Sequence, residues 1–142
     1  MKLVDVNLLI YAVNRDAPLH RTAKIWLEQA LTGSETVAFS WSVLLAFLRL
    51  TTRPGLFRNA LSVDAAFEVI HSWLEQPAAI IVHPGGQHLR VLQDLLGPLG
   101  TGGNLTSDAH LAALAIEHGA EVCSCDADFA RFPALRWRNP LR

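Results

Sequence analysis

Short apolar runs alternate with helical patterns along the whole chain, and this alternation is the strongest constraint on the fold. The β-prone runs cover residues 1–5, 36–40, 79–82 and 121–125. The helical patterns cover 8–12, 18–31, 42–52, 63–74, 87–96 and a last segment that opens at Asp108 and stops at Gly119. Strands separated by helices run parallel, because the helix returns the chain to the same edge of the sheet. The sequence therefore predicts an α/β fold with three α/β/α layers and a central parallel sheet of four to five strands.

Size and composition set the outer limits. A chain of 142 residues with 51% hydrophobic content suits a single domain over residues 1–142. No apolar run reaches the roughly 18 residues of a membrane span, and the amino end does not resemble a signal peptide, so we expect a cytoplasmic protein. The formal net charge of −1 is not typical of a protein held to nucleic acid by charge alone. An RNA ligand would need a local basic patch or contacts through a metal.

Three carboxylates stand where strands meet helices. Asp5 ends the first strand, Asp126 follows the strand at 121–125, and Asp108 opens the helix between them, with Asp128 close behind Asp126. The carboxyl ends of parallel strands and the starts of the following helices share one edge of a sheet, so these acids should converge there. Their repulsion would be costly without a cation. The pattern predicts a divalent metal site.

Each acid also has a structural interpretation as a helix cap or turn residue. Capping alone does not explain why Asp recurs at every such junction, since Ser107 and Thr106 could cap the helix at Asp108. The six histidines show no metal-ligand spacing, so we expect them to be surface or core residues. An all-carboxylate site favours Mg²⁺ (or Mn²⁺) over Zn²⁺.

Several motifs together carry a family resemblance. They are Leu3-Val-Asp5-Val-Asn7, the run from Ser107 to Gly119, Ser124-Cys-Asp126-Ala-Asp128-Phe129, and Leu135-Arg-Trp-Arg-Asn-Pro-Leu141. The chain resembles PIN-domain ribonucleases, and among them VapC-type toxins of VapBC toxin-antitoxin systems. The resemblance implies a PIN-like fold and a metal-dependent endoribonuclease, acting on structured RNA to leave a 5′-phosphate and a 3′-hydroxyl. It also implies a homodimer and a small VapB-type antitoxin as partner.

The resemblance assigns roles to particular residues. Asp5, Asp108 and Asp126 would hold the metal, and Asp128 would complete the catalytic set by orienting water or taking its proton. Asn7 and Ser124 would support these acids. The antitoxin would occupy a groove built partly by helices 18–31 and 42–52.

The chain departs from the family at one position. The family usually carries Glu where this chain has Ala46. A mycobacterial-type subgroup, which this chain resembles, also has a small residue at this position. This gap leaves open an alternative, a catalytically weak or inactive PIN-like module that binds RNA or a partner. An aspartyl-phosphate enzyme is disfavoured because its chemistry uses a later Lys to hold the phosphoryl group, and no Lys follows Lys24. The glycine-rich stretch 97–103 lacks the GK[ST] ending of a P-loop.

Other side chains give further expectations. Arg49, three residues beyond Ala46, is the candidate for phosphate or RNA contact, ahead of Arg15 and Arg21. Cys123 and Cys125 should be buried thiols on opposite faces of their strand. Large apolar side chains should form an exposed interface patch. We expect that patch to include Trp26, Phe47, Leu48, Phe57 and Trp73.

Overall fold

The computed structural model describes residues 1–55 and 58–142 of the chain. Its strands are β1 (Lys2–Val4), β2 (Val37–Ser40), β3 (Ala79–Val82), β4 (Glu121–Cys123) and β5 (Trp137–Arg138). Its α-helices are α1 (Val6–Val13), α2 (His20–Thr32), α3 (Trp41–Thr52), α4 (Val63–Leu74), α5 (His88–Leu96) and α6 (Thr106–His118). Three 3₁₀ turns complete it, η1 (Gly97–Leu99), η2 (Gly103–Leu105) and η3 (Ala127–Arg131).

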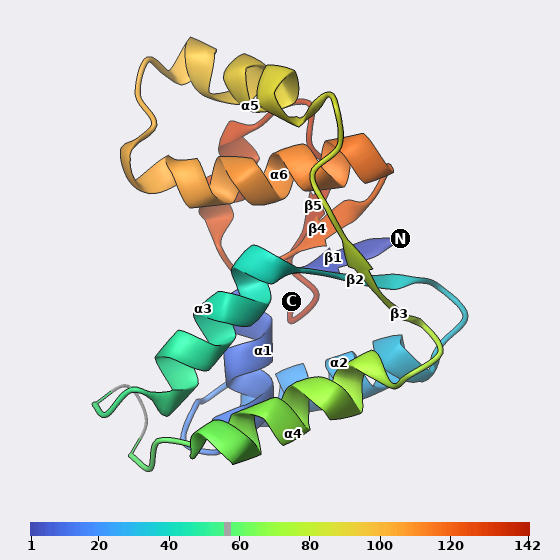
Figure 1. Ribbon diagram of the computed structural model, residues 1–142, viewed down its shortest axis with the longest axis vertical. Coiled ribbons are helices and arrows are strands. Elements are labelled where there is room, and N and C mark those ends of the chain that lie inside the picture. Colours follow the sequence, from blue (N-terminus) through green and yellow to red (C-terminus); the bar gives the residue numbers. More distant parts are fainter. Residues whose placement is uncertain (56–57) are drawn as a thin grey trace.

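All five strands pair in parallel, in the order β3-β2-β1-β4-β5. Helices α5 and α6 pack together on one side of this sheet, and α1 to α4 lie on the other (Figure 1). The predicted three-layer α/β/α fold with a parallel sheet of four to five strands is therefore confirmed. The fifth strand is only two residues long, which is too short to be predicted from the pattern of its residues.

The order of the strands reverses at β1. From β1 the chain moves outward to β2 and β3, and then crosses over to β4 on the other side of β1. A crevice opens beyond the carboxyl ends of the strands at such a switch point, which is the usual ligand site of an open parallel sheet. Asp5 follows β1 at this point, and its backbone N–H donates to the carbonyl of Cys123 in β4 at 3.0 Å.

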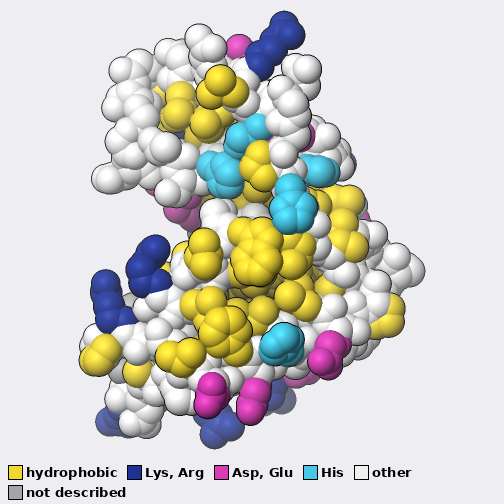
Figure 2. All heavy atoms as spheres, viewed as in Figure 1, with side chains coloured by type: hydrophobic (Ala, Val, Ile, Leu, Met, Phe, Trp, Pro, Cys, Tyr) yellow, Lys and Arg dark blue, Asp and Glu magenta, His cyan; other side chains and the backbone are white. Residues whose placement is uncertain are grey.

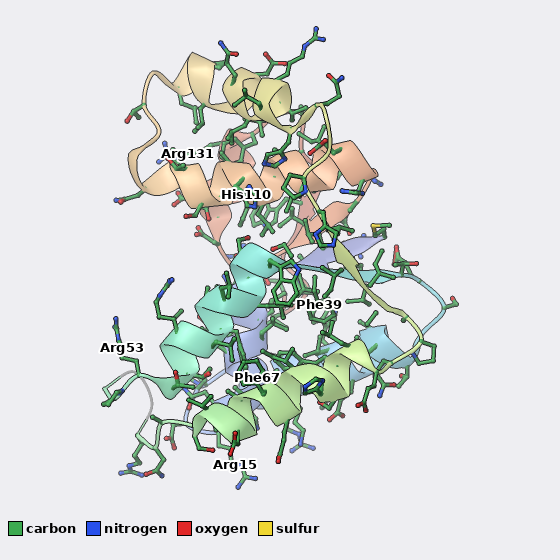
Figure 3. All side chains as sticks on the ribbon, in the orientation of Figure 1. Arg15, Phe39, Arg53, Phe67, His110 and Arg131 are labelled. Atoms are coloured by element: carbon green, nitrogen blue, oxygen red, sulfur yellow. The ribbon has the colours of Figure 1, made fainter. Side chains whose placement is uncertain are left out.

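Aromatic rings pack between the sheet and the helices of the larger layer. Phe39 of β2, labelled in Figure 3, stacks on Trp73 with ring centroids 6.2 Å apart, and Phe47 meets Trp73 edge to face at 5.0 Å. All three side chains are buried. The expectation that Phe47 and Trp73 belong to an exposed patch was therefore wrong, because the inner face of α3 and α4 needs large rings to fill the space above the sheet.

The apolar side chains that do reach the surface are different ones. Trp26 and Leu48 are partly buried against the core, and Phe57 lies outside the described residues. A broad apolar face runs over α3, α4 and β3 in Figure 2. The exposed large apolar side chains of these elements are Trp41, Leu45, Val63, Phe67 and Ile80.

Two differences from the predicted element boundaries bear on the predicted site. Helix α6 begins at Thr106, so Asp108 sits inside its first turn and does not cap it. Strand β4 ends at Cys123, two residues earlier than expected, because the backbone turns at Ser124 to bring Asp126 to the sheet edge. Cys123 is buried, as predicted, whereas Cys125 lies outside the strand and is only half-buried. In the described part of the chain no helix has the length and apolar character needed to cross a membrane.

Candidate active site

Ser124 is the centre of a hydrogen-bonded cluster at the carboxyl ends of β1 and β4. Its hydroxyl is fully buried and donates to Asp5 Oδ2 at 2.6 Å. The same oxygen accepts from Asn7 Nδ2 at 3.1 Å and from the backbone N–H of Asp126 at 3.0 Å. Asn7 returns to the β4 turn, where its Oδ1 accepts from the Cys125 N–H at 3.4 Å. The two residues predicted to support the acids thus tie the β1 and β4 ends together.

Asp5 has a double role that its position explains. It is the N-cap of α1, and its Oδ1 accepts a hydrogen bond from the Val6 N–H at 2.7 Å. Its Oδ2 accepts the hydrogen bond from the Ser124 hydroxyl. The cap interpretation of Asp5 is therefore confirmed, and its second carboxylate oxygen is held at the end of β4 by Ser124. The carboxylate is fixed in orientation at the edge of the sheet.

Asp108, Asp126 and Asp128 come together in front of this cluster. One carboxylate oxygen from each residue lies within 4.8 Å of those of the other two. Asp126 caps η3 by accepting from the Asp128 N–H at 2.8 Å, which turns both carboxylates toward the first turn of α6. Asp128 also meets Arg131 Nε at 3.4 Å on the open side. The geometry thus joins Asp128, expected only to complete the set, directly to two of the expected ligands.

Burial and neighbouring charges at this edge raise the pKa values of Asp5 and Asp108. Burial first, and then the charges of Asp126, Asp5 and Asp128, raise the pKa of Asp108 from 3.8 to about 6. Burial also raises the pKa of Asp5, against the lowering effect of the hydrogen bonds from Ser124 and Val6. The site therefore holds negative charges that repel one another, and a bound cation would relieve that repulsion.

The donor set fits a hard divalent cation. The group consists of the carboxylates of Asp108, Asp126 and Asp128, all three half-buried, and among the described residues no His or Cys belongs to it. Mg²⁺ and Mn²⁺ prefer carboxylate and water oxygens and keep several waters when bound. Of the predicted ligands, Asp108 and Asp126 belong to this group, whereas Asp5 does not. Asp5 lies at the same edge, where it accepts a hydrogen bond from Ser124.

A cavity of about 440 Å³ opens on the α3 side of Asp108. Ala46 lines it together with Asp5 and Asp108, so the position where the family usually carries Glu does face the acids. Arg49 lines the same cavity from one turn further along α3. In Figure 2 the molecule is notched between α6 and α3, with acidic side chains at the inner end of the notch and basic ones on the α3 side.

The other candidate cations are placed elsewhere. Arg15 is exposed and lines a separate cavity of about 420 Å³ between α1, α2 and α4, and Arg21 is exposed on α2. Of the three arginines considered from sequence, only Arg49 lies beside the acids.

A second polar cluster was not foreseen. His88 Nδ1 lies 2.7 Å from Glu117 Oε1, and His88 Nε2 lies 2.9 Å from Nδ1 of His110, which projects from α6 (Figure 3). The Gly85 N–H also donates to Glu117. These contacts join α5 to α6, and nothing in the spacing of the histidines along the chain pointed to them.

Comparison with known proteins places the chain in a family. The sequence model of the PIN domain matches residues 2–135. Ribonuclease VapC37 of Mycobacterium tuberculosis is 47% identical over 140 residues, which span 99% of this chain and 97% of that protein. Ribonuclease VapC33 of the same species is 39% identical over 142 residues, covering 100% and 99% of the two chains.

A solved structure agrees on the fold. The crystal structure of VapBC2 from Rickettsia felis bound to a DNA fragment from their promoter contains a chain that superposes with a TM-score of 0.70. The identity is 19%, and 96% of each chain is covered. The chain described here therefore belongs to the PIN domain family and, within it, groups with the VapC ribonucleases.

Proposed function

We propose that this protein is the toxin of a toxin-antitoxin system and acts in the cytoplasm as an endoribonuclease that depends on Mg²⁺ or Mn²⁺, with residues 1–142 forming one PIN domain. The observation that carries the proposal is the convergence of Asp108, Asp126 and Asp128 within 4.8 Å at the switch point of the sheet, next to Asp5. The ribonuclease names of relatives up to 47% identical support the same activity.

The residues divide the work of phosphodiester hydrolysis between them. Asp108, Asp126 and Asp5 would hold the cation at the sheet edge, and Asp128 would orient the attacking water or accept its proton. When bound, the ion lowers the pKa of water and stabilises the charge that develops on the phosphate oxygens. Ser124 and Asn7 fix the β1 and β4 ends, so that the carboxylates keep their positions during the reaction. Arg49 contacts a phosphate of the RNA from the α3 side. The products carry a 5′-phosphate and a 3′-hydroxyl.

A small antitoxin of the VapB type is the proposed protein partner, and a second copy of the toxin is the other. The exposed apolar face over α3, α4 and β3 supports this, since a contiguous apolar patch on a small protein marks an interaction site. The VapBC2 structure is also named for a complex. We propose that a basic side chain of the antitoxin enters the acidic site and takes the place of the metal.

Cleavage and toxicity assays on matched variants test the proposed function. Asp5→Asn and Asp126→Asn should lose RNA cleavage in Mg²⁺ or Mn²⁺ and should lose growth inhibition on expression, because each removes a charge from the cation site. Asp64→Asn, an exposed acid on α4, is the control that keeps both. End-labelling of the products should find a 5′-phosphate. A wild type that binds RNA or antitoxin without cutting any RNA would identify the inactive binding module instead.

A further inference from the structure

The cavity between α3 and α6 has two unlike ends. Asp5 and Asp108 stand at one end, whereas the remaining lining is mostly apolar or uncharged. Val43, Leu45 and Leu50 come from α3, and Leu111 faces them from α6. Asp126 and Asp128 do not line the cavity, although both lie close to Asp108. Asp108 therefore stands between the acidic cluster and an aliphatic recess.

The aliphatic recess is unsuited to a cation. A hydrated metal ion needs oxygen ligands around it, and beyond Asp5 and Asp108 the polar side chains among the described lining residues are those of Ser42, Ser107 and Arg49. The Ser42 hydroxyl already pairs with Ser40 Oγ at 2.9 Å. The cavity volume of about 440 Å³ falls within the roughly 300–1,000 Å³ of small-molecule pockets. The lining thus suits a flat, largely apolar group with a polar edge.

We propose that this recess is a nucleobase subsite, which takes an unpaired base of the RNA adjoining the phosphate that is cut. The inference rests on the proposed ribonuclease function and adds the kind of nucleotide that the site selects. Enzymes that hold an extruded base place it between apolar side chains and read its edge by hydrogen bonds. Leu45, Leu50 and Leu111 supply apolar walls, and the exposed Ser107, which also lines the cavity, offers its hydroxyl to the base edge.

The position of Arg49 agrees with this assignment. Within the described residues its guanidinium forms no ion pair, so it is available at the mouth of the recess. A guanidinium there can grip the backbone phosphate next to the bound base or stack on the base itself. A base can enter the recess only after leaving its stack, so the substrate strand must be single-stranded at this nucleotide. The site therefore selects loops or bulges over regular duplex.

Ala46 sets the depth of the recess. It is half-buried in the middle of α3, and its small side chain leaves the space open between Arg49 and the acids. Ala46→Leu adds a branched side chain that fills this space without changing any charge. Ala65→Leu is the matched control, since Ala65 is a half-buried helical alanine on α4 that does not line the cavity.

The test pairs these variants with an RNA that lacks one base. A cut site is first mapped on a stem-loop RNA with the wild type in Mn²⁺, and the nucleotide on each side of it is then replaced by an abasic one. We expect the abasic change on one side to lower kcat/KM of the wild type by roughly 10- to 100-fold, the range of a lost pocket contact. Ala65→Leu should show the same loss. In Ala46→Leu the leucine fills the recess. The kcat/KM of this variant on intact RNA, divided by its kcat/KM on the abasic RNA, should therefore fall to near one.

The outcomes separate this inference from the function on which it rests. If the wild type cuts RNA but tolerates an abasic nucleotide on both sides of the cut, the recess holds no base and the inference is overturned while the ribonuclease function stands. The same holds if Ala46→Leu keeps the full wild-type discrimination. If no RNA is cut in Mn²⁺, the proposed function fails and this inference fails with it. Methyl NMR spectra of both leucine variants check that each is folded.

Discussion

Replacing Asp108 by Asn tests what it costs the folded protein to keep a charged carboxylate at this partly buried position beside other acids. Burial and the neighbouring charges raise the pKa of Asp108 from 3.8 to about 6. A shift of about two pKa units corresponds to at most ~3 kcal/mol between the charged and neutral forms. Much of Asp108 is open to water, which screens the repulsion, so we expect a net effect of roughly 1 kcal/mol. The Asn side chain has the same shape and no charge. Without metal at pH 7.5, Asp108→Asn should therefore raise the free energy of unfolding by about this amount.

The pH dependence follows from the direction of the shift. The pKa of Asp108 is higher in the folded protein than in the unfolded chain, so the wild type loses stability as the pH rises from about 4 to about 6. Below that window the carboxyl is protonated in both states and Asp108→Asn has no advantage. The gain should appear between about pH 4 and pH 6 and stay constant above.

Thermal unfolding in EDTA at pH 4.5 and pH 7.5 measures both effects. A gain of roughly 1 kcal/mol corresponds to a rise in Tm of about 3–4 °C for a domain of this size. Mg²⁺ should reverse the order, because an ion at a hundredfold its Kd stabilises the folded wild type by about 2.7 kcal/mol. Asp94→Asn, an exposed acid on α5, should change neither Tm nor its pH dependence. The electrostatic explanation would be refuted if Asp108→Asn were less stable than the wild type at pH 7.5 in EDTA. It would also be refuted if the gain in Tm over the wild type were the same at pH 4.5 and pH 7.5.

Three further predictions concern metal, antitoxin and scaffold. Ala46→Glu should tighten Mg²⁺ binding about 10-fold in calorimetric titration, because position 46 faces the acids. The control Ala65→Glu should leave the affinity unchanged. Equal affinities for wild type and Ala46→Glu would show that the new carboxylate does not reach the ion. Antitoxin affinity should fall as Mg²⁺ rises at fixed ionic strength, and Asp126→Asn should weaken it, because cation and basic side chain compete; an affinity independent of Mg²⁺ would mean that the antitoxin leaves the acids alone. Ser124→Ala removes the hydrogen-bond donor to Asp5 and should lower the free energy of unfolding by about 1–3 kcal/mol in denaturant titrations. An unchanged denaturant midpoint would show that Ser124 does not stabilise the fold.

The sequence was sufficient to predict the fold because its signals are local and repeated. Apolar runs of strand length alternate with helical patterns, and parallel connection by helices leaves few topologies. The same topology rule predicts that Asp5, Asp108 and Asp126 lie at one edge of the sheet, as they do in the structure. Boundaries were less certain. The end of β4 depends on the turn at Ser124, which is fixed by hydrogen bonds to distant residues that no local pattern reveals.

The finer features of the site depend on side-chain packing across elements. The cavity beside Asp108 requires α3 and α6 to face each other at a given distance, and the pair of His88 and His110 requires the same of α5 and α6. The burial of Phe47 likewise depends on how α3 rests on the sheet. Composition and periodicity do not determine these distances, so the sequence alone predicted neither the recess nor the histidine pair and misplaced the exposed apolar face.

Metal add-back on one sample of purified protein tests the central claim most directly. Total RNA is incubated with the wild type in excess EDTA, and Mn²⁺ is then added beyond the chelator, with Asp126→Asn treated in parallel. We predict intact RNA in EDTA, discrete cleavage products after Mn²⁺ is added to the wild type, and no products from the variant under either condition. Equal cleavage by the wild type in EDTA, or cleavage by Asp126→Asn after addition of Mn²⁺ at the wild-type rate, would contradict a cation held by these carboxylates.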